Sequence, residues 1–260
     1  MSEEIKTCCA TLYESDLARM LLGDSFHPGG LRLTRRLGEK LGLRQGMRVL
    51  DVASGKGESA VFLAGTFGCE TVGVDFGAEN VRQASARAAE WKVAHLVEFR
   101  QGDAEKLDFP DGSFDAVICE CAFCTFPDKT VAASEFARML RPGGRVGLSD
   151  LTRAATLPAE LTGLLAWVAC IADARPAVEY VAYLEGAGFS GVEVEPHAEA
   201  LAEMVRGIQG KLLGAELMTK LRNADLPGVD FEQAKSLARA AGEAVRARTL
   251  GYALIVGNGS

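Results

Sequence analysis

Along the first half of the chain, short apolar runs alternate with longer segments in which apolar residues recur every three or four positions. Alternation of this kind predicts strands of a parallel sheet separated by helices. Strands are expected at 48–52, 70–75, 96–100, 116–121 and 145–150, with helices at 58–67, 78–91 and 129–140. The pattern therefore predicts an α/β fold, a Rossmann-like doubly wound sheet with helices on both faces.

Helical patterns flank this region on both sides. Residues 1–45 are expected to form an N-terminal helical cover, interrupted by the turn at His27-Pro28-Gly29-Gly30, and residues 46–260 to form one α/β domain. Later elements are predicted as helices at 158–173 and 177–187, a strand at 192–195, a helical insert at about 198–246 and a last strand at 252–256. The two late strands are expected to pair antiparallel at the sheet edge. The result is a mostly parallel, seven-stranded sheet with the insert as its lid.

Composition and charge narrow the range of partners. The chain has 260 residues, 48% of them hydrophobic and 24% charged, with a net charge of −7. Acidic and basic residues are mixed and form no basic stripe, so nucleic acid is not an expected partner. The longest nearly uncharged apolar stretch, 161–172, is too short to cross a bilayer, and the polar N-terminus does not predict a secretory signal. A small-molecule substrate is therefore expected, and the sequence leaves the oligomeric state open.

The cysteines indicate a reducing compartment. There are 7 of them, an odd number, in a chain long enough to fold without disulfides. We expect reduced thiols in a cytoplasmic protein, although the sequence does not exclude a redox-active pair. The lone Cys121-x-x-Cys124 spacing does not predict a structural zinc site, which needs a second pair of ligands.

A candidate cofactor loop follows the first predicted strand, in Asp51-Val52-Ala53-Ser54-Gly55-Lys56-Gly57. Ligands of doubly wound sheets bind at the carboxyl ends of the strands, and small residues let the backbone approach them. Asp75 ends the second strand, where a carboxylate can accept hydrogen bonds from both ribose hydroxyls. Gly102-Asp103-Ala104 follows the third strand, within reach of an adenine edge. The loop alone is compatible with a tight turn or, through Gly55 to Ala60, with an NAD(P) site.

The ordered set of motifs over residues 47–150 resembles the class I S-adenosylmethionine-dependent methyltransferases. Phe114 to Ile118 and Leu140-Arg141-Pro142-Gly143-Gly144 complete the set and favour this family over NAD(P) enzymes. The resemblance implies S-adenosylmethionine as cofactor. It implies contacts with the methionine portion, the ribose and the adenine from Asp51, Ala53, Ser54, Gly55, Asp75, Phe76, Asp103, Ala104 and Glu120. The family has glycine where this chain has Ala53.

The methyl acceptor is expected beyond the end of the fourth strand. There the chain reads Cys119-Glu120-Cys121-Ala122-Phe123-Cys124. A free cysteine is commonly a small buried hydrophobe, the interpretation favoured for Cys69 and Cys119. Cys121, at the exit of the strand, and Cys170, in a helix after the fifth strand, are candidates for chemistry instead.

A narrower resemblance links Asp115 to Lys129, and Ser149-Asp150 followed later by Cys170, to the arsenite methyltransferases. It implies that Cys121 and Cys170 bind trivalent arsenic, with Cys8, Cys9 or Cys124 as a third ligand. Thiolates select such soft centres, and arsenic keeps a lone pair that attacks the methyl group without a base. Residues 23–30 have no cysteine, unlike the segment before the cofactor loop in that family.

Other acceptors remain open. One is hydrogen sulfide, methanethiol or another small thiol or selenol. Another is a carbon or oxygen of a small metabolite, for which Glu120 and His27 are candidate groups for proton transfer. A histidine beside Pro-Gly-Gly is more often a turn residue. A third hypothesis is a sensor that binds a metalloid through its thiols without methylating it.

Overall fold

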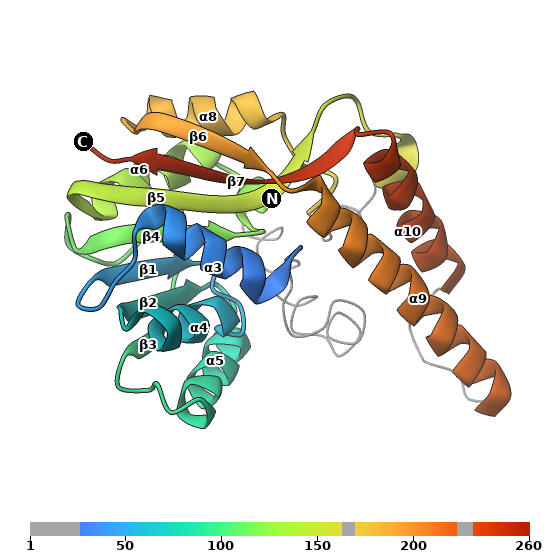
Figure 1. Ribbon diagram of the computed structural model, residues 1–260, viewed down its shortest axis with the longest axis horizontal. Helices are drawn as coiled ribbons and strands as arrows, with labels where there is room; N and C mark the ends of the chain where they lie inside the picture. Colours follow the sequence, from blue (N-terminus) through green and yellow to red (C-terminus); the bar gives the residue numbers. More distant parts are fainter. Residues whose placement is uncertain (1–26, 163–169, 223–230) are drawn as a thin grey trace.

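The computed structural model describes residues 27–162, 170–222 and 231–260. Within these ranges, seven strands form one sheet at the centre of the molecule, in the order β3-β2-β1-β4-β5-β7-β6 (Figure 1). The strands are β1 (Arg48–Val52), β2 (Glu70–Asp75), β3 (Val97–Gln101), β4 (Phe114–Glu120), β5 (Leu140–Arg153), β6 (Ser190–Pro196) and β7 (Leu250–Asn258). β1 to β5 pair in parallel, whereas β7 runs antiparallel to both of its neighbours. The predicted Rossmann-like, mostly parallel sheet is confirmed.

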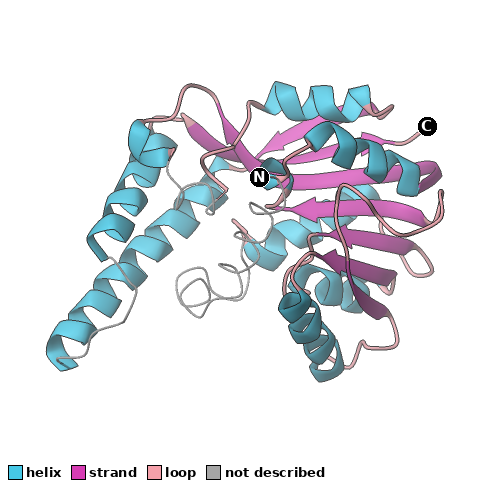
Figure 2. Ribbon diagram, turned by 180° about the vertical axis from the view of Figure 1, so that it is seen from behind, coloured by secondary structure: helices cyan, strands magenta, loops and turns pink. Residues whose placement is uncertain are grey.

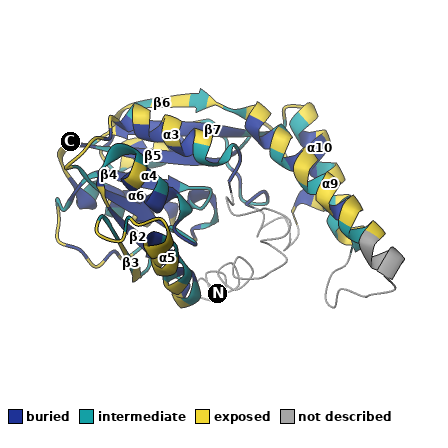
Figure 3. Ribbon diagram, turned by 60° about the horizontal axis from the view of Figure 1, so that its bottom comes forward, coloured by how far each residue is buried: buried dark blue, intermediate teal, exposed yellow. Residues whose placement is uncertain are grey.

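Helices cover both faces of the sheet, as expected for parallel strands (Figure 2). α3 (Gly30–Leu41), α4 (Glu58–Phe67) and α5 (Ala78–Glu90) lie on one face, and α6 (Lys129–Met139) and α8 (Ala177–Gly186) on the other. β1 and β4 are buried on both faces, which explains their nearly uninterrupted apolar runs. Buried residues concentrate in the sheet and on the helix faces that contact it (Figure 3).

The cover helix α3 is amphipathic, with Leu33, Leu37 and Leu41 buried at a spacing of one helical turn. Its other face is bonded to the sheet edge, because the Arg36 guanidinium donates to both carboxylate oxygens of Glu195 at 3.0 and 2.8 Å. The described part of the predicted cover is therefore docked on the sheet. The rest of it, with Cys8 and Cys9, lies outside the described residues.

The helical insert between the last two strands consists of α9 (Ala198–Arg222) and α10 (Phe231–Arg246). The two helices pack on each other and project beyond the edge where β1, β4 and β5 end (Figure 1). The predicted antiparallel pairing of the late strands is confirmed, with β6 at the edge and β7 between β5 and β6. Among the described residues, no helix is long and apolar enough to cross a membrane.

Two expected elements differ from the prediction. β5 begins at Leu140, and Arg141 to Gly144 form an irregular first part of the strand, where the register with β4 shifts between Phe114 and Ala116. Gly143 takes φ 76°, which suits glycine and lets the chain bend there. The helix predicted at 158–173 is wrong in its described parts. These are the 3₁₀ turn η2 (Ala159–Leu161) and a turn that begins at Cys170.

Glycine is required where β2 faces the ring of Phe99. A Cβ atom on Gly73 would overlap that ring and stand 2.8 Å from the Ser54 hydroxyl oxygen. Gly65, in contrast, lies on the exposed side of α4, where the nearest contact of an added Cβ would be an ordinary 3.7 Å. The two positions form a matched pair.

We expect Gly73→Ala to lower the free energy of unfolding by about 1–3 kcal/mol, because Phe99 and Ser54 must move. Gly65→Ala is expected to raise it by about 1 kcal/mol, because alanine is the better helix former. Urea unfolding followed by circular dichroism measures both changes. Equal effects of the two substitutions would contradict the close packing of β2 against Phe99.

Candidate functional site

The predicted cofactor residues gather where β1, β2 and β4 end. After β1, the backbone N–H of Ser54 donates to the carbonyl of Val74 at 3.0 Å, which ties the loop to β2. The backbone N–H of Gly55 donates to Asp75 Oδ2 at 2.7 Å. An added Cβ on Gly55 would meet nothing within 4 Å. Gly55 therefore faces open space, which leaves room for a ligand against the backbone.

Ala53 adopts a left-handed backbone, with φ 58°. Glycine enters this region freely, whereas other L-residues lose roughly 1–2 kcal/mol there. The glycine expected at this position in the family has a conformational reason, and Ala53 keeps the same backbone shape at a cost in strain.

Asp75 holds the loop, its own strand and the start of α5 together. Its Oδ1 accepts from the backbone N–H of Gly77 at 2.9 Å and from the Asn80 amide at 3.0 Å. Burial raises the pKa of this carboxyl, and the hydrogen bonds from Asn80, Gly77 and Gly55 act in the opposite direction. A carboxylate has about four acceptor positions and three are used here, so Asp75 keeps capacity for about one further hydrogen bond, from a ribose hydroxyl predicted to bind there.

Three polar atoms in this region are buried and have no hydrogen-bond partner: Asp51 Oδ2, Ser54 Oγ and Asn80 Oδ1. Asp51 is only 2% exposed. Burial, followed by the negative charges of Glu120 and Asp75, raises its pKa well above the ordinary value. Buried polar atoms without partners are rare, and three of them beside the open backbone of Gly55 are available to a ligand. S-adenosylmethionine carries an ammonium and a sulfonium group, so these residues fit the expected cofactor.

Glu120 is the centre of a buried network that the sequence did not reveal. Its side chain is 4% exposed. Oε2 accepts from the Thr34 hydroxyl at 3.0 Å and the Ser59 hydroxyl at 2.5 Å, and Oε1 accepts from Ser149 at 3.1 Å. Tyr252 in turn donates to the Ser149 oxygen at 2.8 Å. The donors come from α3, α4 and β5, so only the fold brings them to Glu120.

His27 lies at the end of this network and is 8% exposed. Its Nε2 is 3.8 Å from Glu120 Oε2 and 3.3 Å from the Thr34 oxygen, and its Nδ1 is 3.4 Å from the carbonyl of Pro28. His27 therefore lies beside Glu120 and Thr34, and its catalytic role stays a prediction.

The thiols of Cys121, Cys124 and Cys170 come together from two distant parts of the chain. The Cys170 thiol donates to the carbonyl of Cys121 at 3.1 Å, and the Cys124 thiol donates to the carbonyl of Cys170 at 3.6 Å. Cys121 and Cys170 both have left-handed backbones, with φ 54° and 61°. A thiol hydrogen bond with Cys170, together with burial, raises the pKa of Cys121, and mainly burial raises that of Cys124.

Asp150 lies beside these thiols and was not predicted as a site residue. It is fully buried in β5, and its Oδ2 accepts from the backbone N–H of Cys124 at 2.8 Å. Burial and the neighbouring Cys170 raise the pKa of Asp150 to about 7, although hydrogen bonds from Cys124 and Leu151 oppose the rise. A carboxyl that ionises near neutral pH is placed to exchange a proton with the thiols.

The other predicted residues lie at the same edge of the sheet. Phe76 follows β2, and its carbonyl accepts from the Gln101 amide at 3.0 Å. After β3, Asp103 Oδ1 accepts from the backbone N–H of Glu105 at 3.0 Å, and Ala104 packs against the core. Cys69 and Cys119 are fully buried, in keeping with the apolar interpretation. Among the described residues, no group of three or more His, Cys, Asp or Glu is arranged to hold a metal ion.

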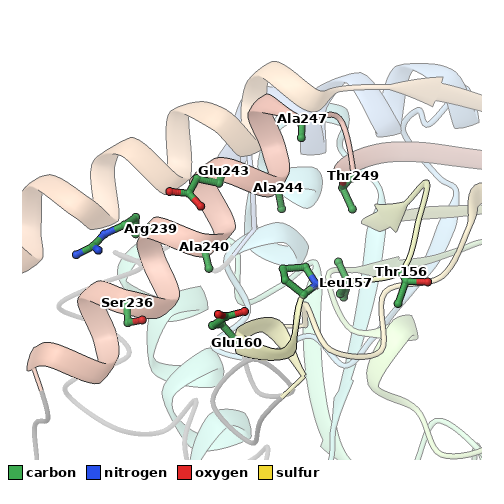
Figure 4. Close-up of a pocket in the computed structure, with 11 residues that line it drawn as sticks. Thr156, Leu157, Glu160, Ser236, Arg239, Ala240, Glu243, Ala244, Ala247 and Thr249 are labelled. Atoms are coloured by element: carbon green, nitrogen blue, oxygen red, sulfur yellow. The ribbon is translucent and has the colours of Figure 1, made fainter.

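A separate cavity of about 650 Å³ lies between α10 and the segment that leads into η2 (Figure 4). Arg239 and Glu243 line it from α10 and Glu160 from η2. None of the predicted site residues is among its lining residues. It lies at the boundary between the insert and the rest of the molecule, away from the cofactor loop.

Comparison with known proteins finds similarity to methyltransferases. Residues 50–148 match a family described as a methyltransferase domain. The chain is 35% identical to 27-O-demethylrifamycin SV methyltransferase of Amycolatopsis mediterranei, over 52% of this chain and 54% of that protein. It is 32% identical to an arsenite methyltransferase of Halobacterium salinarum, over 71% of this chain and 48% of that protein. The chain thus spans about half the length of these two relatives.

Among solved structures, phosphoethanolamine N-methyltransferase 2 of Haemonchus contortus, in complex with S-adenosyl-L-methionine, superposes with a TM-score of 0.81. The superposition covers 98% of this chain and 60% of that one, at 19% sequence identity. At this identity the likeness concerns the fold.

Asp51→Asn should stabilise the free protein at neutral pH. The folded state keeps the Asp51 proton to a higher pH than the unfolded chain, so it binds more protons above about pH 4 and loses stability as the pH rises. We expect the substitution to raise the free energy of unfolding by roughly 1–3 kcal/mol at pH 7, and by much less near pH 4.

Urea unfolding at both pH values measures this difference. Asp111→Asn, which removes an exposed partner of Arg138, is the control and should change stability by less than about 1 kcal/mol. If Asp51→Asn is less stable than the parent at pH 7, the buried Asp51 carboxylate does not destabilise the ligand-free protein, and the prediction is wrong.

Proposed function

We propose that this chain, which belongs to the class I S-adenosylmethionine-dependent methyltransferases, methylates a small soft nucleophile, with trivalent arsenic held by cysteine thiols as the first candidate. The convergence of Cys121, Cys124 and Cys170 beyond the end of β4 is the observation that carries this proposal. The similarity to an arsenite methyltransferase over 71% of the chain supports it. Hydrogen sulfide, methanethiol and other small thiols are the next candidates.

S-adenosylmethionine, the cofactor of this family, supplies a methyl group on a sulfonium centre and leaves as S-adenosylhomocysteine. The buried Asp51 carboxylate is suited to its ammonium group, and Asp75 to its ribose hydroxyls. Glu120, whose carboxylate accepts from three hydroxyls, adds an acidic wall near Asp51. Charge on this wall favours a cation and disfavours an anionic cofactor.

Protonated thiols suit arsenite as a substrate. When a thiol replaces a hydroxide on arsenic, one As–S bond forms and one As–O bond breaks, and the thiol proton leaves with the hydroxide as water. No net proton is released, so the raised pKa values of Cys121 and Cys124 do not oppose binding. Asp150, which faces Cys124, can carry the proton between thiol and hydroxide.

Cys124 is the third ligand that the described residues favour. It lies in η1 (Phe123–Thr125), and its thiol hydrogen-bonds to the carbonyl of Cys170. Cys8 and Cys9 remain the other candidates for this position. The arsenic lone pair then attacks the methyl group, and no residue is needed as a base.

The first experiment measures S-adenosylhomocysteine production, in the presence of glutathione, with arsenite, with sulfide or methanethiol, or with no acceptor. Arsenite-dependent turnover is expected. It should fall roughly 100-fold or more in Cys121→Ser and in Cys170→Ser, since misplacement of a reacting atom costs this much. Cys69→Ser, a buried cysteine next to Thr71 and outside the thiol cluster, is the control and should keep its activity.

Turnover with sulfide or methanethiol but not arsenite would move the proposal to thiol methylation. Full arsenite activity in both cysteine variants would overturn arsenic binding by these thiols. Absence of turnover under every condition would reject a soft acceptor altogether.

A hydroxyl or carbon of a small metabolite is the second candidate acceptor. The buried His27 beside Glu120 favours it, because a hydroxyl needs a group that takes its proton. One curated relative is also named for an O-demethylated rifamycin. Replacing Cys121 and Cys170 together by serine would leave turnover of such an acceptor nearly unchanged.

For a hydroxyl acceptor, we expect His27→Ala to lower kcat by about 10²–10⁴-fold, the range typical of general bases. Turnover of arsenite should change far less, because its lone pair needs no base. Steady-state kinetics with each acceptor gives the comparison. His197→Ala, whose ring pairs with Glu195 at the sheet edge, is the matched control. Unchanged kcat in His27→Ala with a hydroxyl substrate would exclude His27 as the base.

A further inference from the structure

Lys129 and Asp173 form a buried ion pair next to the thiol cluster. Their Nζ and Oδ2 atoms are 2.6 Å apart, and their side chains are only 5% and 12% exposed. Lys129 also donates to the carbonyl of Phe126 at 2.9 Å. The proposed reaction uses neither side chain. An ion pair that leaves water carries a desolvation penalty, and apolar residues often replace it without loss of stability, so its contribution to stability does not explain it.

The pair joins the two segments that bring the cysteines together. Lys129 is the first residue of α6, directly after the segment of Cys121 and Cys124, and its bond to Phe126 fixes the end of that segment. Asp173 lies in the turn that begins at Cys170. The two segments are more than 40 residues apart in sequence, as the separation of 44 between Lys129 and Asp173 shows. Contacts that involve side chains, among them the Lys129–Asp173 pair and the thiol bond of Cys170 to the Cys121 carbonyl, connect the two segments.

The turn is anchored again on its far side. Arg175 donates to Asp173 Oδ1 at 2.5 Å. Arg153, at the end of β5, donates through its side chain to the carbonyl of Ala174 at 2.7 Å and through its backbone to that of Arg175 at 3.1 Å. Contacts from β5 and from α6 therefore meet at the turn, through Ala174 and Arg175 on one side and Asp173 on the other. The left-handed backbone of Cys170 requires such support from its surroundings.

We propose that the Lys129–Asp173 pair positions the Cys170 thiol against Cys121. The pair holds the turn of Cys170 at the distance where its thiol reaches the Cys121 carbonyl. Loss of the pair leaves the turn attached to β5 through Arg153 but releases it from α6. The inference rests on the proposed function in one respect, namely that Cys170 binds the methyl acceptor. The geometric claim about the thiol stands apart from the acceptor's identity.

Lys129→Met removes the charge and keeps most of the apolar stem, while Asp173 retains Arg175 as partner. We expect the rate of alkylation of Cys170 by iodoacetamide, followed by peptide mass spectrometry, to rise roughly tenfold, with Cys69 unchanged. KM for arsenite should rise roughly tenfold, while KM for S-adenosylmethionine stays the same. Asp173→Asn provides a second variant in case Lys129→Met does not fold.

Lys235→Met is the control. It breaks the ion pairs of Lys235 with Glu216 and Glu232 on the helical insert and should leave both readouts unchanged. Unchanged alkylation of Cys170 in both Lys129→Met and Asp173→Asn would overturn the proposal. So would equal increases at Cys170 and Cys69, which indicate a general loss of stability. Faster alkylation of Cys170 alone, in a protein whose parent does not turn over arsenite, would support the positioning role and reject the proposed acceptor.

Discussion

The hydrogen bonds of Asp75 are the interaction on which the rest of the site depends. One carboxylate receives the backbone N–H of Gly55 from the loop after β1, the backbone N–H of Gly77 after β2 and the amide of Asn80 from α5. These bonds fix the loop after β1 against β2 and the start of α5. They also bring a second buried charge close to Asp51, which raises the pKa of Asp51 further. Asp75 therefore fixes the position of the loop and of the start of α5, and its charge also raises the pKa of Asp51.

On the acceptor side, a carboxylate and a thiol follow each other at the end of β4, where Glu120 is the last residue of the strand and Cys121 comes next. Glu120 faces hydroxyl groups from three elements and forms the wall toward the cofactor loop. The next residue, Cys121, has a left-handed backbone and its carbonyl accepts from the thiol of Cys170. The end of β4 therefore places the carboxylate of Glu120 directly before Cys121, whose backbone is strained. In the proposed function, the carboxylate faces the cationic cofactor and the thiols hold the acceptor. Such a division suits methyl transfer from a cationic donor to a soft acceptor.

The helical additions determine what surrounds this edge. α3 is docked through leucines on one side and through the Arg36–Glu195 pair on the other, so it carries Thr34 and His27 to Glu120. α9 and α10 project beyond the same edge (Figure 1), and α10 lines a cavity together with η2 and the segment before it. We propose that they act as the lid of a single methyltransferase domain, residues 46–260. The cavity beside them is lined by charged side chains, including Glu160, Arg239 and Glu243, whereas Cys124 and Cys170 of the thiol cluster are buried.

The sequence by itself determined the α/β sheet, its helices and the loop that follows β1, because the periodicity of apolar residues and the small residues of a turn act locally. It also placed Asp51, Asp75, Asp103 and Cys121 correctly at strand ends, since alternation along a strand locates its exit.

The tertiary structure alone decided which side chains meet. Thr34, Ser59 and Ser149 come to Glu120 from three elements, and Asp150 and the Lys129–Asp173 pair come to the thiols through long-range packing. Cys170 was predicted in a helix but lies in a turn, because contacts with Lys129, Arg153 and Cys121 outweigh the local helical pattern. Local periodicity carries no information about such contacts, which depend on how distant segments pack.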